Sequence, residues 1–250
     1  MLSAPVPLGR RLLAEGVGTG LLVTVIVGAG IAATRLSPHD LGAQLFYDST
    51  ATALGLSVLI LVLGPVSGAH LNPVVSAADW WLGRRQGTGL PGRALSAYAV
   101  AQVVGAVAGA LLANVMFDVP AGMATTDRSD WRLWLGEVVA TTGLVTLVLA
   151  LARTGRGDWA APAVGAYIGA AYWFTSSTSF ANPAVTVGRM FSDSFAGIAP
   201  PSAPAFVLAQ LVGGAVGLSL TLGLYPDVAT AADRIVVPHG ASGPRRGTDR

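Results

Sequence analysis

The sequence predicts an all-α membrane protein with six transmembrane helices and two shorter re-entrant helices. Of its 250 residues, 52% are hydrophobic and 11% are charged, and the mean hydropathy is +0.61, which lies outside the range of an ordinary soluble domain. Six long apolar runs divide the chain, and two polar stretches with an Asn-Pro pair, Ser67–Ser76 and Ser179–Met190, interrupt them. Six spans with short loops use nearly all of the chain, so we expect one transmembrane domain over residues 1–250.

The first half of the chain contains three of the expected spans, at about Leu12–Ala33, Leu45–Pro65 and Ala94–Met116. The first run is too long for a signal peptide, contains Glu15 and lacks a convincing cleavage site, so it is interpreted as a span. The polar segment Phe117–Asp130 follows the third span and predicts a loop that crosses to the second half.

The second half repeats this plan. Its spans are expected at about Trp131–Ala152, Trp159–Thr175 and Ala203–Tyr225. Repeat one therefore covers about residues 10–116 and repeat two about residues 131–225. The tail from Pro226 to Arg250 is polar, and we expect it to be mostly disordered.

Each Asn-Pro pair predicts the start of a short helix. Asn can cap a helix with its side chain, and proline suits the first helical position because it lacks a backbone N–H. The helices that begin at Pro73 and Pro183 should run to about Leu82 and Phe191, which is too short to cross a bilayer. Irregular backbone at membrane depth is tolerated where it lines a cavity. We therefore expect two re-entrant loops that face a pore, with the positive ends of their helix dipoles pointing at its centre.

The two halves match beyond the Asn-Pro pairs. The stretch Ala99–Gly105 resembles Val207–Gly213, and Glu15 in span one has Glu137 as its counterpart in span four. Because each half has three spans, the second copy must insert inverted relative to the first. Glycines at four-residue spacing allow close approach of spans three and six; they are Gly105, Gly109, Gly213 and Gly217.

Together these residues resemble the major intrinsic proteins, the aquaporins and aquaglyceroporins. The resemblance rests on the two Asn-Pro boxes, Asn72–Val74 and Asn182–Ala184, and on the SGAHLNP loop, the AEGVGT opening of span one and the AYAVAQVVGA stretch of span three. It covers roughly residues 10–225. It implies the aquaporin-like fold and a homotetramer with one pore in each subunit.

The resemblance also assigns residues to the pore. Asn72 and Asn182 would be paired amide donors at its centre, each beginning a box with the residues Pro73 and Val74 or Pro183 and Ala184. Backbone carbonyls would form a ladder of acceptors on either side of the centre; they belong to Gly68, Ala69, His70, Leu71, Phe180 and Ala181. The alternative reading, in which both Asn residues are ordinary helix caps, is compatible with this role.

The selectivity filter departs from the family pattern. Most members place Arg three residues after the second Asn, where this chain has Val185, so a fixed charge and up to five donors are absent from that position. The other walls would be Thr52, Ser179 and an aromatic residue of span five. That aromatic is either Trp173 or Tyr172, of which Trp173 is assigned to the filter; anchoring at the lipid interface is the alternative for both.

Four further side chains have two readings each. Glu15 and Glu137 could mark an ion path, but the resemblance implies that they brace the re-entrant loops. His70 could gate with pH, and a structural loop residue is the preferred reading. Arg189, two helical turns beyond Asn182, is read as an anchor at the end of its helix rather than as a displaced filter arginine.

A filter with two hydroxyls, one methyl face and no charge suits small neutral polyhydroxy solutes. Arg-less sequences with a TSFANPAVT stretch resemble a bacterial branch associated with arsenic resistance, which implies passage of arsenite as neutral As(OH)3, glycerol-like polyols and some water. A strict water channel and a proton-coupled secondary transporter remain the alternatives.

Other classes of function lack support in the sequence. No enzyme constellation, metal-site spacing or cofactor motif is present, cysteine is absent, and a net charge of +2 gives no nucleic-acid signal. Arginines flank the spans mainly on one side, and that side is expected to be cytoplasmic. We therefore expect both termini on the cytoplasmic side, in a bacterial inner membrane.

Overall fold

The computed structural model describes residues 6–84, 89–120 and 122–225, and the predicted disordered tail, residues 226–250, lies outside them. Within these ranges the chain is helical and contains no strand. The helices are α1 (Leu8–Leu36), α2 (Leu41–Ser67), α3 (Pro73–Gly83), α4 (Gly92–Met116), α5 (Trp131–Arg153), α6 (Ala160–Phe174), α7 (Pro183–Arg189) and α8 (Ala203–Leu224). Short 3-10 turns at Gly157–Trp159 and Pro200–Ser202 precede α6 and α8.

Each of the six predicted spans has a helix within a few residues of its expected bounds. Five of them, α1, α2, α4, α5 and α8, are long and apolar enough to cross a membrane. The exception is α6, whose 15 residues rise only about 22 Å at 1.5 Å per residue, against about 30 Å of hydrocarbon. The chain leaves α6 at Phe174 and enters the second re-entrant loop directly.

The two short helices begin as the Asn-Pro pairs predict. The Asn72 side chain accepts a hydrogen bond from the backbone N–H of Val74, and that of Asn182 accepts from Ala184 and Val185, with proline at the first helical position of both α3 and α7. These caps leave few unsatisfied N–H groups at the buried helix starts. The helix α7 ends at Arg189, two residues before the predicted end at Phe191, because the N–H of Phe191 bonds back to Gly188 in a tight turn.

Glycines allow the closest helix contacts. In α4, a Cβ added at Gly105 would lie 2.0 Å from the carbonyl oxygen of Gly16 in α1, and one at Gly109 would lie 2.0 Å from that of Gly20. In α8, Gly213 and Gly217 face α5 in the same way. The glycines therefore bring span three against span one and span six against span four. The predicted close approach of spans three and six to each other is wrong, because these glycines face the neighbouring helix of their own repeat.

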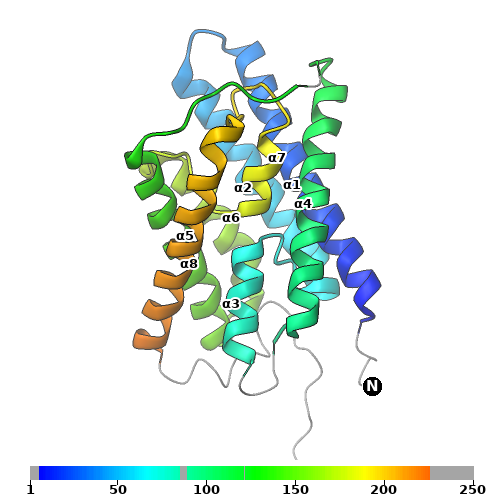
Figure 1. Cartoon of the computed structure of the whole chain (residues 1–250), viewed down its shortest axis with the longest axis vertical. Coiled ribbons are helices and arrows are strands. Elements are labelled where there is room, and N and C mark those ends of the chain that lie inside the picture. The colour runs from blue at the N-terminus through cyan, green and yellow to red at the C-terminus, as the bar shows by residue number, and fades with distance from the viewer. Residues whose placement is uncertain (1–5, 85–88, 121, 226–250) are drawn as a thin grey trace, which may run out of the picture.

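The half-helices interlock the two repeats. In Figure 1, α3 occupies the lower part of the bundle and α7 the upper part, while the start of α1 and the end of α8 both lie at the bottom. The helix α7 packs against α4 and α1 of the first repeat, and α3 contacts α8 and α5 of the second. This arrangement brings the N-terminal ends of α3 and α7 together in the middle of the molecule.

Candidate functional site

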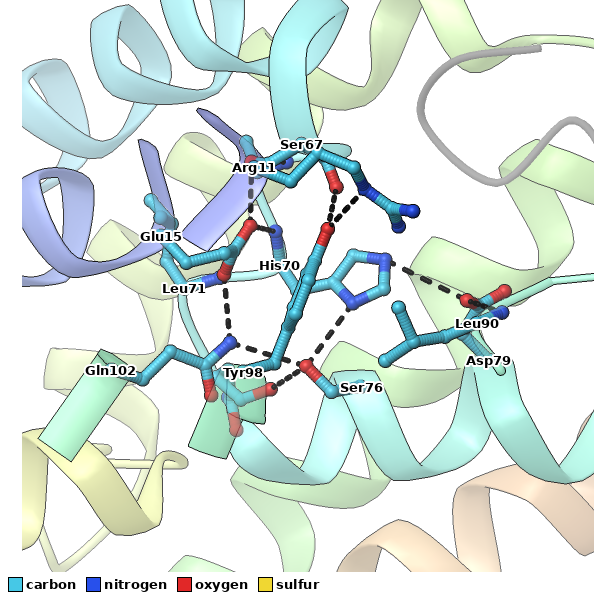
Figure 2. Close-up of polar contacts among 12 residues, drawn as sticks. Arg11, Glu15, Ser67, His70, Leu71, Ser76, Asp79, Leu90, Tyr98 and Gln102 are labelled. Carbon is cyan, nitrogen blue, oxygen red and sulfur yellow. Dashed lines mark hydrogen bonds and ion pairs between the residues drawn. The ribbon is translucent and has the colours of Figure 1, made fainter. Parts of the chain in front are cut away.

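The first re-entrant loop is held by the buried carboxylate of Glu15 on α1 (Figure 2). One carboxylate oxygen accepts from the Ser67 hydroxyl at 2.6 Å and from the backbone N–H of His70 at 3.0 Å. The other accepts from the N–H of Leu71 and from the Gln102 amide, both at 2.7 Å. One side chain thus satisfies two backbone donors of the loop and links α1 to α4.

The second loop has the same support from Glu137 on α5. Its carboxylate accepts from the backbone N–H of Phe180 at 2.9 Å and of Ala181 at 2.8 Å, and from the Gln210 amide at 2.6 Å. Both buried glutamates therefore make the contacts of braces, because each carboxylate joins two successive N–H groups of its loop to a glutamine of a neighbouring span.

The braced backbone has an unusual conformation. Ala69 and Leu71 have φ angles of 46° and 50°, and Ser179 and Ala181 have φ angles of 53° and 49°. Residues other than glycine rarely adopt this left-handed region, and each such residue costs of order 1 kcal/mol or more. Hydrogen bonds from two consecutive N–H groups of each loop to its glutamate stabilise this strained conformation. The conformation turns successive carbonyls of the loop toward the centre.

At the centre, the two Asn side chains bond across the repeats. Asn72 donates from Nδ2 to the carbonyl of Ala181 at 2.8 Å, and Asn182 donates to the carbonyl of Leu71 at 2.7 Å. Each amide oxygen caps its own helix, so each side chain is fixed at both ends. An amide carries two N–H donors, and this cross-link uses one of them in each Asn.

A cavity of about 60 Å³ runs past this centre. Its apolar wall comes from spans of both repeats and from α3, and consists of Leu22, Ile26, Leu56, Ile60, Val75, Leu144, Val148, Ala160, Val164 and Ile168. Its polar side is formed by the two loops, including Asn72, Asn182 and the predicted ladder residues Ala69, His70, Leu71, Phe180 and Ala181. A cavity with one polar and one apolar side can take up a short file of small molecules.

The predicted filter residues Thr52, Ser179 and Val185 also line this cavity. The hydroxyl of Ser179 is buried without a hydrogen-bond partner, whereas that of Thr52 lies 3.1 Å from the hydroxyl of Tyr172. The layer therefore presents one unpaired hydroxyl, a pair of bonded hydroxyls and the Val185 methyl groups.

Tyr172, and not Trp173, is the aromatic residue at this layer. Tyr172 lines the cavity and is buried. The Trp173 side chain is 52% exposed, does not line the cavity, and donates its indole N–H to the Ser49 hydroxyl of α2. The assignment of Trp173 to the filter is wrong because neighbouring residues of a helix point about 100° apart.

Five of the predicted pore residues lie beside the cavity rather than on its lining. Four of them begin the two half-helices and one ends α2; they are Pro73, Val74, Pro183, Ala184 and Gly68. Val74 packs against Gly214 of α8, where an added Cβ would lie 2.4 Å from its methyl group. These residues place the helices, and the neighbouring loop residues form the lining.

Arg189 lies in the lining, contrary to its reading as an end-of-helix anchor alone. The side chain is 2% exposed, its Cζ is 3.4 Å from the centroid of the Phe180 ring, and its Nε donates to the carbonyl of Ala196. Residues four apart share one face of a helix, so Arg189 lies one turn beyond Val185. The guanidinium missing at Val185 is thus present one turn farther along α7.

A second arginine lies nearby in the crossing loop. Arg128 donates from Nε to the carbonyl of Gly197 at 3.0 Å, and its Cζ is 5.0 Å from the Phe180 ring centroid. Burial, followed by the like charge of Arg189, lowers the pKa of Arg128 to about 10. It remains a cation at neutral pH, so two guanidinium groups contact one aromatic ring at this end of the cavity.

Asp48 on α2 was not identified from the sequence. It is 1% exposed, and neither carboxylate oxygen has a hydrogen-bond partner. It lies one turn from Thr52 on the same face of α2 and interacts electrostatically with Arg189. An acidic residue four positions before a filter residue, inside an apolar span, is the signal that could have found it.

His70 lies at the opposite end of the cavity among polar groups of α3 and α4 (Figure 2). Its Nδ1 is 3.1 Å from the Ser76 hydroxyl, and its Nε2 is 3.9 Å from an Asp79 carboxylate oxygen. The ring also packs against Tyr98, with 5.6 Å between ring centroids. These contacts fix the imidazole within the first loop.

The interlocked half-helices and the narrow two-sided cavity define the fold of a membrane channel. The family model described as "Major intrinsic protein" matches residues 3–179. The chain belongs to the major intrinsic protein family and is a multi-span integral membrane protein.

Similar proteins share much of the chain. It is 48% identical over 216 residues to "Aquaglyceroporin AqpS" of Rhizobium meliloti (strain 1021), covering 85% of this chain and 89% of the relative. It is 31% identical over 229 residues to a "Glycerol uptake facilitator protein" of Pseudomonas aeruginosa, covering 79% of each. The structure of the aquaglyceroporin from Plasmodium falciparum has the same fold, with a TM-score of 0.67 and 18% identity over 90% of this chain and all of that one.

Proposed function

We propose that this channel passes small neutral hydroxylated solutes down their gradients: glycerol-like polyols, metalloid hydroxides such as arsenite in its As(OH)3 form, and some water. The observation that carries the proposal is the filter layer, where the methyl groups of Val185 face the hydroxyls of Thr52, Tyr172 and Ser179. Hydroxyls can replace part of a solute's hydration, and the methyl groups contact its carbon or metalloid skeleton.

The names of similar proteins support this class of solute. Relatives include an aquaglyceroporin, a glycerol uptake facilitator and, at 29% identity over 174 residues, a "Propanediol uptake facilitator PduF" of Citrobacter freundii. Glycerol and propanediol are small, neutral and hydroxylated. Passage of arsenite is the finer part of the proposal, and it rests on the arginine-free filter layer.

The centre of the pore would supply ion exclusion. The dipoles of α3 and α7 add partial positive charge where Asn72 and Asn182 meet, and the amides offer donors to a passing oxygen. Cations, including protons, would find no compensating carboxylate there, because those of Glu15 and Glu137 are occupied by the loops.

We further propose a homotetramer in a bacterial inner membrane with both termini in the cytoplasm. The start of α1, the end of α3 and the start of α4 lie at the lower end of the bundle in Figure 1. These helix ends carry Arg10, Arg11, Arg84 and Arg93, and an excess of arginine is typical of cytoplasmic loops. The outer face is apolar, with exposed side chains such as Leu61, Val100 and Leu208 that suit lipid or a neighbouring subunit.

A strict water channel is the second candidate. The observation that favours it is the position of Tyr172 and Arg189 in the lining, since both are large side chains at the end of the cavity that holds the filter. Under this reading the pore admits water but excludes glycerol and arsenite.

Stopped-flow light scattering on proteoliposomes separates these functions. An impermeant osmolyte reports water flux by vesicle shrinkage, and glycerol reports solute flux by re-swelling, with arsenite uptake measured on the same vesicles. We expect glycerol and arsenite to enter the wild-type vesicles. Val185→Arg should slow both, because the guanidinium adds bulk and charge to the layer.

Val185→Leu is the matched control, since it adds bulk without charge. A smaller loss of solute flux in Val185→Leu than in Val185→Arg would support a filter defined by its lack of charge. Rapid water flux with glycerol and arsenite excluded from the wild type would overturn the proposal and leave the water channel.

A further inference from the structure

Two charged side chains lie outside the neutral filter layer, one on each of two helices that help to form it. Asp48 precedes Thr52 by four residues on α2, and Arg189 follows Val185 by four residues on α7. Residues four apart in a helix share a face. The helix α2 begins at the top of the bundle in Figure 1, and α7 runs from the centre toward the same end, so both charges are displaced in the same direction.

The bonding of these residues is incomplete. Asp48 is buried, and neither of its carboxylate oxygens makes a hydrogen bond of good geometry. The neighbouring donor is the Thr52 hydroxyl, which also lies 3.1 Å from the hydroxyl of Tyr172. Arg189 donates from Nε to a backbone carbonyl, and among the described residues no ion pair joins it to Asp48. The two groups nevertheless interact electrostatically. Because buried polar groups are almost always hydrogen-bonded, an unpartnered carboxylate at this depth indicates a place for a donor.

We propose that Asp48 and Arg189 form an outer solute-binding ring, in which one hydroxylated neutral solute donates hydrogen bonds to Asp48 and accepts them from Arg189. This ring would select the solute before it reaches the layer of Thr52, Ser179 and Val185. The inference rests on the proposed function and names the residues that recognise the solute class.

The chemistry of the pair explains the choice of ligand. A carboxylate only accepts and a guanidinium only donates, whereas a hydroxyl does both. A solute with several hydroxyls can therefore bridge the two groups, and bonds to charged partners are the stronger ones. A cation would be repelled by Arg189 and by Arg128, which both lie over the ring of Phe180. An anion could pair with the guanidinium groups but not with Asp48, so only a neutral hydroxylated solute satisfies both members of the ring.

Water depends less on such a ring than a polyol does. A water molecule in a file keeps hydrogen bonds to the waters before and after it. A polyol or As(OH)3 gives up the hydration of several hydroxyls at one level and needs partners there. Removing either charged group should therefore slow solute entry more than water flux.

The test is a double-mutant cycle read by glycerol and water flux in proteoliposomes. Asp48→Asn keeps the shape of the side chain but replaces one acceptor with a donor, and Arg189→Gln removes the charge. We expect each to lower glycerol permeability about tenfold, the effect of losing one hydrogen bond to a charged group, with water permeability within about twofold of wild type. Because both residues hold one solute, the double variant should be little worse than either single variant.

Two further variants keep the result interpretable. Asp118→Asn makes the same change of charge on the exposed crossing loop, at a residue whose φ of 52° asparagine tolerates, and should leave both fluxes unchanged. Arg189→Lys replaces Arg189→Gln in the cycle if the latter does not fold, since it keeps the charge and loses the planar fork.

Three outcomes would overturn the ring: an unchanged ratio of glycerol to water flux in Asp48→Asn, equal loss of both fluxes in each single variant, or losses that multiply in the double variant. If wild-type vesicles exclude glycerol, the proposed function itself fails. If they pass glycerol and the Asp48 and Arg189 variants behave as wild type, only the ring fails.

Discussion

At the scale of single residues, the buried glutamates hold strained backbone in both re-entrant loops. Glu15 accepts four hydrogen bonds, and two of them come from the consecutive backbone N–H groups of His70 and Leu71. Leu71 has a left-handed backbone conformation. Such a conformation persists only where the surroundings fix it. The carboxylate supplies acceptors on both of its oxygens, which an amide cannot do.

Glu15→Gln is therefore expected to be strongly destabilising. The amide nitrogen would face N–H donors, and each buried bond to a charged group that is lost costs about 1.5–3 kcal/mol. The expected result is a lower thermal unfolding midpoint in detergent together with loss of glycerol flux. Asp158→Asn, on the exposed turn before α6, is the control and should match the wild type. A Glu15→Gln protein with wild-type stability would show that the loop holds itself.

The residues at the site differ in how well the sequence predicts them. Asn72, Asn182 and the two glutamates are marked by motifs that occur once in each half. Arg189 and Asp48 belong to no motif that is repeated in the two halves. Whether they contribute to the site depends on which face of their helix points inward. Tyr172 could be separated from Trp173 only by the rotation of α6, which the structure supplies.

At the scale of elements, hydropathy and caps placed every helix. The five long spans follow from apolar runs of 22 or more residues, and both half-helices follow from Asn-Pro caps. The end of α7 could not be read from the sequence, because the turn after Arg189 depends on contacts with the loop up to Pro200. The glycine pattern predicted close approach, but the partner helices are fixed by the tertiary packing.

Gly109→Ala tests one of the two tightest of these contacts. Its Cβ would meet the Gly20 carbonyl oxygen at 2.0 Å, and Thr24 bonds across the same interface to the Gly109 carbonyl. We expect the α1–α4 contact to open at a cost of about 1–3 kcal/mol, typical of overpacking. The measurement is the thermal unfolding midpoint of the purified protein.

Gly223→Ala provides the matched control for that change. This glycine also lies in a helix, α8, and an added Cβ there meets nothing within 4 Å. Alanine is the better helix former, so Gly223→Ala should leave stability unchanged or raise it slightly. Equal destabilisation by both substitutions would mean that the α1–α4 contact is not the cause.

At the scale of the whole molecule, the two repeats share one arrangement of helices but place different side chains at the two ends of the cavity. Positions 110 residues apart carry His70 and Phe180 beside the loops, and Asp79 and Arg189 in the later part of each half-helix. Asp79 lies near His70 at 3.9 Å, and Arg189 contacts Phe180. Equivalent positions thus place a carboxylate at one end of the cavity and a guanidinium at the other.

The packing of the two repeats against each other distinguishes a channel from a secondary transporter. Alternating access requires one repeat to move as a body against the other. In this chain each half-helix packs on spans of the opposite repeat, and Asn72 and Asn182 bond reciprocally to carbonyls of the opposite loop. Rocking one repeat would break these buried hydrogen bonds and separate α7 from α4.

We therefore expect solute flux through a continuously open path. Glycerol flux into proteoliposomes should rise linearly with its gradient, run equally well in both directions, and stay unchanged when ionophores collapse proton or sodium gradients. A coupled carrier must cycle between conformations once per solute, so its flux saturates and responds to the driving ion. Saturation at millimolar glycerol, or uptake that follows an imposed proton gradient, would require the repeats to separate during transport and would contradict the interlocked arrangement.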